Sequence, residues 1–505
     1  MRGLVLLVGA LVACQPESDH GTVRVGTDVD AESLDPRLTS NTTGSRVTDL
    51  LYDGLLQLDT MLEPVPNLAR SWEHPDSVTW VFHLRDGVRF HNGSSLTASD
   101  VVYTFETIVD PQLRSPVRTL YAPIDKVEAP DDTTVEFTLS HPYAAFLKYL
   151  DLGIVPKNLL LEGHNLSRQP VGSGPYGLSG WNKGSKITLV ANEHYWKGKP
   201  NVPNIEIVLV ADNTARAQSF EAGDLDLIQS PLAPPDVERL AADTRFSGET
   251  TVGIAITYLN FNTAVPVLND PRMRRALAML VDQKTIVGEI YQNMDRPATS
   301  IFPPSSWAHT DDVRQPQYDP ERARRILGQM GWHDSDNDGF LDKNGKKLTV
   351  RLGTHSEDVN RVQTIEFLQH SFAESGVDVR VEISDWASFS ARRNAGDYEI
   401  ILLGWTQIVD PDRVTFEQLH SSGGLNWGKF ANATLDSLLE RGRSSERHAD
   451  RVAAYHAAAR LIASQVPYYI ISYQGYQVFY DSRIRGFEPN PRGRLRSLAR
   501  STIVN

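Results

Sequence analysis

The 505-residue sequence has a single cysteine, so it cannot form a disulfide bond within one chain. The fold must rest on its apolar core, and 40% of the residues are hydrophobic, which is enough to form one. After the first thirteen residues, no apolar run reaches the roughly 20 residues that a membrane-spanning helix needs. A chain of this length is expected to form two or three domains.

The sequence also lacks an excess of basic residues. It has 50 Lys and Arg against 63 Asp and Glu, a net charge of −13. Binding to nucleic acid needs a basic surface, so this balance argues against it. The Gly-x-Ser-x-Gly pattern of hydrolases, the His-Glu-x-x-His pattern of zinc peptidases and the Gly-Lys-Ser/Thr end of a phosphate loop are all absent. These absences favour a binding function over an enzymatic one.

The N-terminus has the features of an export signal. A basic residue precedes an apolar run that is too short to cross a bilayer. The run ends in Leu11-Val12-Ala13-Cys14, which resembles a bacterial lipobox, whose cysteine is diacylated. We therefore expect residues 1–13 to be a lipoprotein signal peptide, Cys14 to carry a lipid anchor and residues 14–21 to form a tether. The alternative is an ordinary secretory signal with an incidental cysteine.

The segment from Pro66 to Ile108 carries the clearest local signals. Apolar and polar side chains alternate from Val78 to Arg85, which predicts a strand with one buried face. The dipeptide Asn92-Gly93 predicts a turn. Thr97, followed three residues later by an aspartate, predicts a helix cap, and apolar residues at helical spacing follow it. Further along, residues 143–150 are expected to form another helix.

The residues of this segment resemble the signature of family 5 extracellular solute-binding proteins, the large receptors of peptide and nickel ABC importers. The matching residues are Leu68-Ala69, Ser71-Trp72-Glu73, Phe82-His83-Leu84-Arg85-Asp86-Gly87-Val88, Phe90-His91-Asn92-Gly93, Leu96-Thr97-Ala98 and Asp100-Val101. Further matches, such as Gly172-Ser173-Gly174-Pro175-Tyr176, extend the resemblance over essentially the whole mature chain. The resemblance implies an α/β, periplasmic-binding-protein-like fold of two lobes with an extra third domain.

The resemblance also implies where the domains begin and end. Domain I is expected to be a discontinuous lobe made of residues 22–57, 174–255 and 478–505. Domain II, residues 58–173, would be inserted into it, and domain III, residues 256–477, would form the second lobe. In such proteins the two lobes close over a solute by a hinge motion.

The main ligand loop is expected after the apolar run Ile400 to Leu403, which predicts a central strand. Ligands of open α/β sheets bind at the ends of strands, and Trp405 lies at such an end. The resemblance implies that Trp405 packs on the ligand. Peptide-binding members place an Asp against the ligand amino group, whereas this chain has Ile408 there. Asp410 would either substitute for that Asp or cap the next turn.

A second departure concerns the ligand carboxylate. Dipeptide receptors carry an Arg for it after an earlier strand, and this chain has His355 and Ser356 in that region. Both departures argue against a free dipeptide as the ligand.

The resemblance suggests further residues of the ligand site, because aromatic walls bind variable side chains by area and polar groups fix orientation. These residues are Ser40, Thr42, Tyr258, Trp386, Arg393, Asn426 and Trp427. The alternative for each Trp is core packing, and the alternative for Ser40 and Thr42 is loop or cap chemistry.

One acidic stretch resembles the front half of a calcium loop. Asp334, Asp336 and Asp338 alternate, glycine stands at the sixth place, and Asp342 follows. The twelfth place is Gly345, where such loops need a bidentate Glu. An ordinary acidic turn is therefore favoured over a metal site, and no cofactor is expected.

The leading interpretation is an exported receptor, anchored by lipid on the periplasmic or cell-surface side of a membrane. It would capture an oligopeptide or another amine- or carboxylate-bearing solute, with nickel chelates and sugars as alternatives. Its partners would be the permease subunits and ATPase of an ABC importer, and it would be a monomer. The rival interpretations are a solute sensor or adhesin without import, and a hydrolase.

Overall fold

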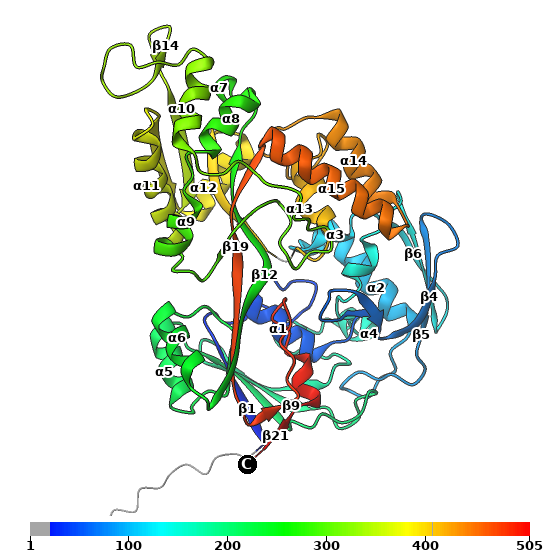
Figure 1. Ribbon diagram of the computed structural model, residues 1–505. Helices are drawn as coiled ribbons and strands as arrows, with labels where there is room; N and C mark the ends of the chain where they lie inside the picture. The colour runs from blue at the N-terminus through cyan, green and yellow to red at the C-terminus, as the bar shows by residue number, and fades with distance from the viewer. Residues whose placement is uncertain (1–20, 407, 505) are drawn as a thin grey trace, which may run out of the picture.

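The computed structural model of the protein describes residues 21–406 and 408–504 (Figure 1). The predicted signal peptide, Cys14 and all of the predicted tether except Gly21 therefore lie outside the described residues. Among the described helices, none combines the length and the apolar character that crossing a membrane requires.

One mixed sheet runs through most of the molecule (Figure 1). Its strands are β1 (Thr22–Thr27), β8 (Tyr176–Asn182), β9 (Lys186–Ala191), β10 (Asn204–Leu209), β11 (Leu227–Ile228), β12 (Phe246–Phe261), β13 (Arg296–Pro297), β16 (Thr349–His355), β17 (Asp378–Ser384), β18 (Ile400–Trp405) and β19 (Tyr468–Asp481). They lie in the order β17-β16-β18-β12-β19-β11-β1-β10-β9-β8, and β13 pairs with β19. The expected α/β fold class is confirmed.

Helices flank the two halves of this sheet and define two lobes. The N-terminal lobe holds β1, β8 to β11 and the helices α1 (Thr42–Leu51), α5 (Asn213–Glu221) and α6 (Pro234–Ala242). The second lobe holds β16 to β18 and the helices α8 (Pro271–Ala278), α10 (Pro320–Gln329), α11 (Val359–Ala373), α12 (Trp386–Ala395), α13 (Pro411–Leu419), α14 (Ala433–Ser444) and α15 (His448–Gln465). The two lobes lie at the bottom and the top of Figure 1.

Two long neighbouring strands join the lobes. β12 and β19 pair as antiparallel strands from Phe246 opposite Asp481 to Asn260 opposite Tyr468. Their register shifts between Val252 and Ile256, in the middle of the pair. Because a β-bulge lets a strand bend, this irregularity is the natural position of a hinge.

An inserted subdomain lies beside both lobes, on the right of Figure 1. It is a four-stranded sheet in the order β4-β5-β7-β6, covered by α2. The bounds of these elements are β4 (Ala69–Glu73), β5 (Thr79–Leu84), β6 (Ile124–Asp131), β7 (Thr134–Leu139) and α2 (Ala98–Val109). The ring of Phe137 meets Phe82 and Phe105 edge to face, at centroid distances of 5.7 and 5.0 Å.

Several local predictions are confirmed. β5 has the predicted alternation of burial, and α2 starts with the predicted capping box of Thr97 and Asp100. β18 is buried between β16 and β12, as expected for a central strand.

The predicted helix over residues 143–150 is wrong. The chain forms only a short 3₁₀ turn, Phe146–Tyr149. Tyr143, Phe146 and Tyr149 are all buried in the core of the inserted subdomain. Residues three apart eclipse one another in a 3₁₀ turn, so this geometry directs the three rings to the same side.

A close backbone approach links the inserted subdomain to the N-terminal lobe. The N–H of Gly174 donates to the carbonyl of Leu51 at 2.9 Å, and the N–H of His91 donates to the carbonyl of Gly172 at 2.7 Å. A β-carbon at Gly172 would overlap the Leu51 carbonyl oxygen. The two segments of the chain can therefore approach this closely only because position 172 has no side chain.

We expect Gly172→Ala to lower the free energy of unfolding by about 1–3 kcal/mol, because the added methyl group meets rigid backbone. Denaturant unfolding measures this change. Gly180→Ala is the matched control, since a β-carbon there would meet no atom within 4 Å. Equal stability of the two variants would contradict the proposed backbone contact.

Candidate functional site

A polar cavity of about 450 Å³ lies between the lobes. Its floor is formed by the hinge strands, at Thr257 and the residues 474–477. The N-terminal lobe contributes Gln229 and the following residues 231–234, and the second lobe contributes the start of α11. The cavity is thus lined from both lobes.

Amide side chains dominate the polar lining of this cavity. The amide residues are Asn213, Gln229, Gln292, Asn360, Gln474 and Gln477. Gln229 is only 4% exposed, and neither of its amide atoms makes a hydrogen bond of good geometry within residues 21–406 and 408–504, although the hydroxyl of Tyr476 lies near it. A buried amide without partners is costly, so Gln229 is suited to pair with a bound molecule.

Arg361 brings the one guanidinium group among the residues lining the described cavity. It lies in the first turn of α11 and forms an ion pair with Asp358 at 3.1 Å. Its Nη1 lies 2.8 Å from Nε2 of His355. Because a guanidinium only donates, this ring nitrogen accepts, and Nδ1 of His355 donates to Glu357 at 2.9 Å. Gly404 leaves the space for Arg361, since a β-carbon there would overlap the guanidinium.

The sequence did not predict Arg361. It predicted the carboxylate-binding position at His355 and Ser356, where dipeptide receptors carry an Arg. The region that was predicted to hold the arginine is nevertheless next to Arg361, because His355 contacts Arg361 directly. The signal available in the sequence was Asp358, which caps α11 and places Arg361 three residues later.

Two tryptophans and one arginine that the resemblance suggested do lie together. Trp386 is 48% exposed at the start of α12, and its ring meets His355 edge to face at 5.1 Å. The guanidinium of Arg393 lies over both Trp386 and Trp427, 5.6 and 3.9 Å from the ring centroids. Burial lowers the pKa of Arg393, and no carboxylate forms an ion pair with it among the described residues. This stack forms an aromatic wall with a cation inside it.

Trp405 ends β18 and is half-buried against the apolar core of the second lobe. The guanidinium of Arg413 lies 5.8 Å from its ring centroid, and its indole N–H makes no hydrogen bond within the described residues. A free indole N–H at the end of a central strand can still donate to a ligand.

Asp410 takes the capping role that was one of its two alternatives. It is 1% exposed, accepts a hydrogen bond from the N–H of Asp412 at 3.0 Å and caps α13. Its carboxylate also pairs with Arg451 at 2.7 Å. Ile408 is 2% exposed. The carboxylate of Asp410 is thus directed to α15 and is already neutralised by a protein cation.

The remaining suggested residues make structural contacts. Tyr258 is fully buried and its ring stacks on Tyr468 at 4.7 Å. Asn426 donates to two backbone carbonyls and accepts from the N–H of Phe430. Ser40 is exposed and donates to Glu32, and Thr42 is the first residue of α1, after the capping Asn41.

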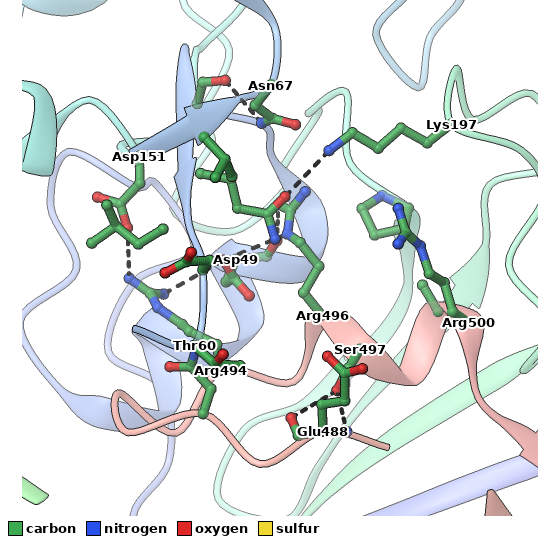
Figure 2. A pocket seen from close by; sticks show the side chains of 18 of the residues that line it. Asp49, Thr60, Asn67, Asp151, Lys197, Glu488, Arg494, Arg496, Ser497 and Arg500 are labelled. Carbon is green, nitrogen blue, oxygen red and sulfur yellow. Dashed lines mark hydrogen bonds and ion pairs between the residues drawn. The ribbon is translucent and has the colours of Figure 1, made fainter. Parts of the chain in front are cut away.

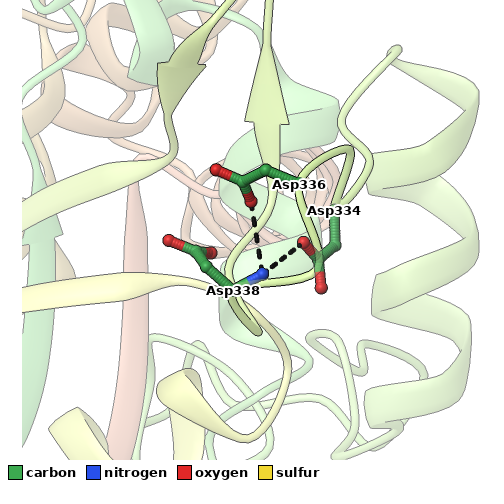
Figure 3. Close-up of side chains that lie close together, drawn as sticks. All are labelled: Asp334, Asp336 and Asp338. Atoms are coloured by element: carbon green, nitrogen blue, oxygen red, sulfur yellow. Dashed lines mark hydrogen bonds between the residues drawn. The ribbon is translucent and has the colours of Figure 1, made fainter.

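The acidic loop brings three of its four aspartates together (Figure 3). The N–H of Asp338 donates to both Asp334 and Asp336, at 3.1 and 3.2 Å. Asp338 also pairs with Lys347 at 2.6 Å. Asp342 lies outside this group and accepts two hydrogen bonds from Ser335. These contacts are those of an acidic turn closed by its own backbone.

We expect the protein to have the same melting temperature in about 1 mM calcium as in an excess of EDTA. Lys347 already pairs with Asp338, and backbone N–H groups already donate hydrogen bonds to Asp334 and Asp336. A site filled at a hundred times its Kd would stabilise the protein by about 2.7 kcal/mol. A calcium-dependent rise in melting temperature that Asp334→Asn abolishes would contradict this expectation.

Comparison with known proteins identifies the family. Residues 63–427 match the description "Bacterial extracellular solute-binding proteins, family 5 Middle". The chain is 30% identical to Protein XP55 of Streptomyces lividans, over 94% of this chain and 87% of that one. It is 27% identical to the probable di/tripeptide-binding protein 5 of Pseudomonas aeruginosa, over 97% of each chain.

A solved structure has the same fold. The oligopeptide-binding protein AppA of Bacillus subtilis, in complex with a nonapeptide, superposes with a TM-score of 0.80. The two chains are 25% identical, and the match covers 96% of this chain and 99% of that one. Since the family match spans more than half of the chain, this protein belongs to family 5 of the bacterial extracellular solute-binding proteins.

Proposed function

We propose that this protein is the extracytoplasmic receptor of an ABC importer. It captures an oligopeptide or a related small solute between its lobes and delivers it unchanged to the permease and its ATPase. The observation that carries this proposal is the polar cavity that both lobes line over the two hinge strands. The proposal includes export as a monomer and a lipid anchor on Cys14, which holds the receptor on the periplasmic or cell-surface side of a membrane.

The amide-rich lining supports a ligand with peptide groups. Carboxamides offer both donors and acceptors, which match the N–H and C=O groups of a peptide backbone. Gln229 is 4% exposed, and among the described residues neither of its amide atoms makes a hydrogen bond of good geometry. A peptide that pairs with Gln229 removes the cost of about 1–3 kcal/mol that an unsatisfied buried polar group carries.

Arg361 supports a carboxylate at one end of the ligand. Guanidinium and carboxylate groups form strong paired hydrogen bonds, and Arg361 shares its charge with Asp358 alone among the ion pairs of the described residues. Asp410 does not serve as the partner of a ligand ammonium, because it is 1% exposed and its carboxylate both caps α13 and pairs with Arg451. The ligand we favour therefore carries a carboxylate and does not depend on an ammonium held by this loop.

The aromatic wall supports side-chain binding. Trp386, Arg393 and Trp427 present flat surfaces that bind different side chains by area. Neither this wall nor Trp405 lines the interlobe cavity itself, but Trp386 contacts His355, which contacts Arg361 in the cavity lining. We propose that the wall and Trp405 form side-chain pockets beside the cavity.

We also propose the three-domain division that the sequence suggested. One apolar cluster takes most of its members from residues 55–154, in the inserted subdomain. Another gathers the N-terminal strands with the C-terminal segment, from Val23 to Leu498. Separate cores support separate domains.

Native mass spectrometry of the protein as purified tests the proposal directly. A receptor that encloses its solute retains a fraction of it through purification, so we expect protein masses increased by those of small peptides or peptide-like solutes. Tandem fragmentation then identifies them. Chemically altered products from an added peptide library would overturn the receptor interpretation in favour of a hydrolase.

We expect Arg361→Gln to weaken binding of the recovered solute by about 1.5–3 kcal/mol, the value of a hydrogen bond to a charged group. Isothermal titration calorimetry gives the Kd. Arg380→Gln is the control, because Arg380 is an exposed arginine on β17 outside the cavity. If both variants bind as the original protein does, Arg361 does not contact the solute.

We expect Trp405→Ala to weaken the same binding by at least about 2 kcal/mol, as truncation of a buried aromatic anchor does. Trp181→Ala serves as the control, since Trp181 is a half-buried indole on β8 in the N-terminal lobe. An unchanged Kd together with a lowered melting temperature would assign Trp405 to the core alone.

A further inference from the structure

A second, larger cavity of about 650 Å³ lies outside the interlobe cleft. It is formed where the hairpin of β2 (Leu56–Leu58) and β3 (Pro64–Pro66) meets the loop after β9 and the C-terminal segment 486–500. The two cavities have no lining residue in common. Figure 2 shows side chains from these separate segments directed at one another around the pocket.

The charge of this lining departs from that of the whole chain. Six basic residues line the cavity, which are Lys197, Lys199, Arg492, Arg494, Arg496 and Arg500. The acidic residues of the lining are only Asp49, Asp59, Asp151 and Glu488. The chain as a whole has a net charge of −13, so the cavity concentrates positive charge in an acidic protein.

Three of the arginines are neutralised by aspartates that surround the cavity. Arg496 pairs with Asp53 at 2.5 Å and with Asp49 at 3.6 Å. Arg492 and Arg494 both pair with Asp151. These buried pairs hold the C-terminal segment against both the N-terminal lobe and the inserted subdomain, and they add little net charge.

Lys197 is different, because no carboxylate contacts it among the described residues. Its half-buried ammonium lies 3.2 Å from the amide oxygen of Gln57 and 4.8 Å from the ring centroid of Trp196. Burial, together with Arg496, Arg500 and Arg85, lowers the pKa of Lys197 to about 8, and Asp53 opposes this shift. Asp53 is already paired with Arg496. The corner around Lys197 therefore holds more positive than negative charge.

Arg500 provides a second cation on the same side of the cavity (Figure 2). Its side chain is exposed, and no ion pair involves it in the part of the chain that the structure describes. Lys199, on the same loop as Lys197, pairs with Glu193 at the rim. The cations that a bound anion can reach without breaking an internal pair are thus Lys197 and Arg500.

We propose that this cavity binds an organic phosphate monoester through Lys197 and Arg500. Two cations on one side of the cavity match the charge of a phosphomonoester, about −1.5 to −2 at neutral pH. The volume of about 650 Å³ exceeds what a bare phosphate ion fills, so there is room for an organic body. Gln57, Thr60, Asn67 and Ser497 offer hydrogen bonds to that body, and Pro66 offers it an apolar surface.

Calorimetric titration with glycerol 3-phosphate tests this site on the complete mature chain at low ionic strength. We expect saturable binding that weakens by about tenfold or more in Lys197→Gln and in Arg500→Gln, since each variant removes a charge-assisted hydrogen bond. Lys197→Arg should retain binding. Lys183→Gln, which removes an exposed lysine outside the cavity, is the matched control and should bind as the original protein does.

A phosphomonoester can also come from a lipid headgroup, so a second arm uses vesicles that contain phosphatidic acid against vesicles of phosphatidylcholine alone. Binding to the first alone, lost in Lys197→Gln and Arg500→Gln but not in Lys183→Gln, would support the phosphate site with a lipid headgroup as its source. Failure of both arms, or equal effects of all three variants, would overturn the proposal. Melting curves exclude misfolding as the cause, and the exposed Arg500→Gln variant is expected to fold normally.

Discussion

The architecture depends on the backbone pairing of β12 with β19. These strands pair from one lobe to the other, and the neighbouring strands of both lobes attach to them. Their register breaks between Val252 and Ile256, where the ladder is interrupted. Thr257 and the residues 474–477, which line the cavity between the lobes, lie at or next to this break, so the bulge lies at the proposed solute site. We therefore expect closure of the lobes over a solute to bend the sheet beside this cavity.

A second contact constrains that motion. The N–H of Ala144 in the inserted subdomain donates to the carbonyl of Arg443 in α14 at 2.8 Å. The guanidinium of Arg443 lies 5.3 Å from the Tyr143 ring centroid and pairs with Asp412 at 2.8 Å. Burial raises the pKa of Asp412, and Arg443 opposes this shift. Any rotation of the second lobe must carry the inserted subdomain with it or break this contact.

Local sequence patterns predicted those structural features that depend on residues close together in the chain. The alternation in β5, the capping box of α2 and the buried run of β18 all follow from residues a few positions apart. The candidate ligand site depends on contacts between residues that lie far apart in the sequence. Arg451, 41 residues further along the chain, holds the carboxylate of Asp410 in an ion pair, and Gly404 leaves the space that the guanidinium of Arg361 occupies.

The second cavity could not be predicted from local sequence patterns either. Most of its lining comes from residues 49–67, 195–201 and 486–500, and none of these segments alone carries a recognisable binding motif. The resemblance to a family supplied the fold, since the fold is shared across relatives that are only 25–30% identical. It did not supply the contacts of individual side chains, because these depend on substitutions particular to this chain.

The central claim is that two lobes close over a solute by bending at β12 and β19. Fluorescence energy transfer between labels at Glu238 of α6 and Glu366 of α11, both exposed and in opposite lobes, measures this directly. Cys14 is the one native cysteine, so replacing it gives a background in which Glu238→Cys and Glu366→Cys are labelled selectively. The account predicts that the solute recovered from the protein raises the transfer efficiency in a saturable way. A solute that binds by calorimetry and leaves the transfer efficiency unchanged would contradict it.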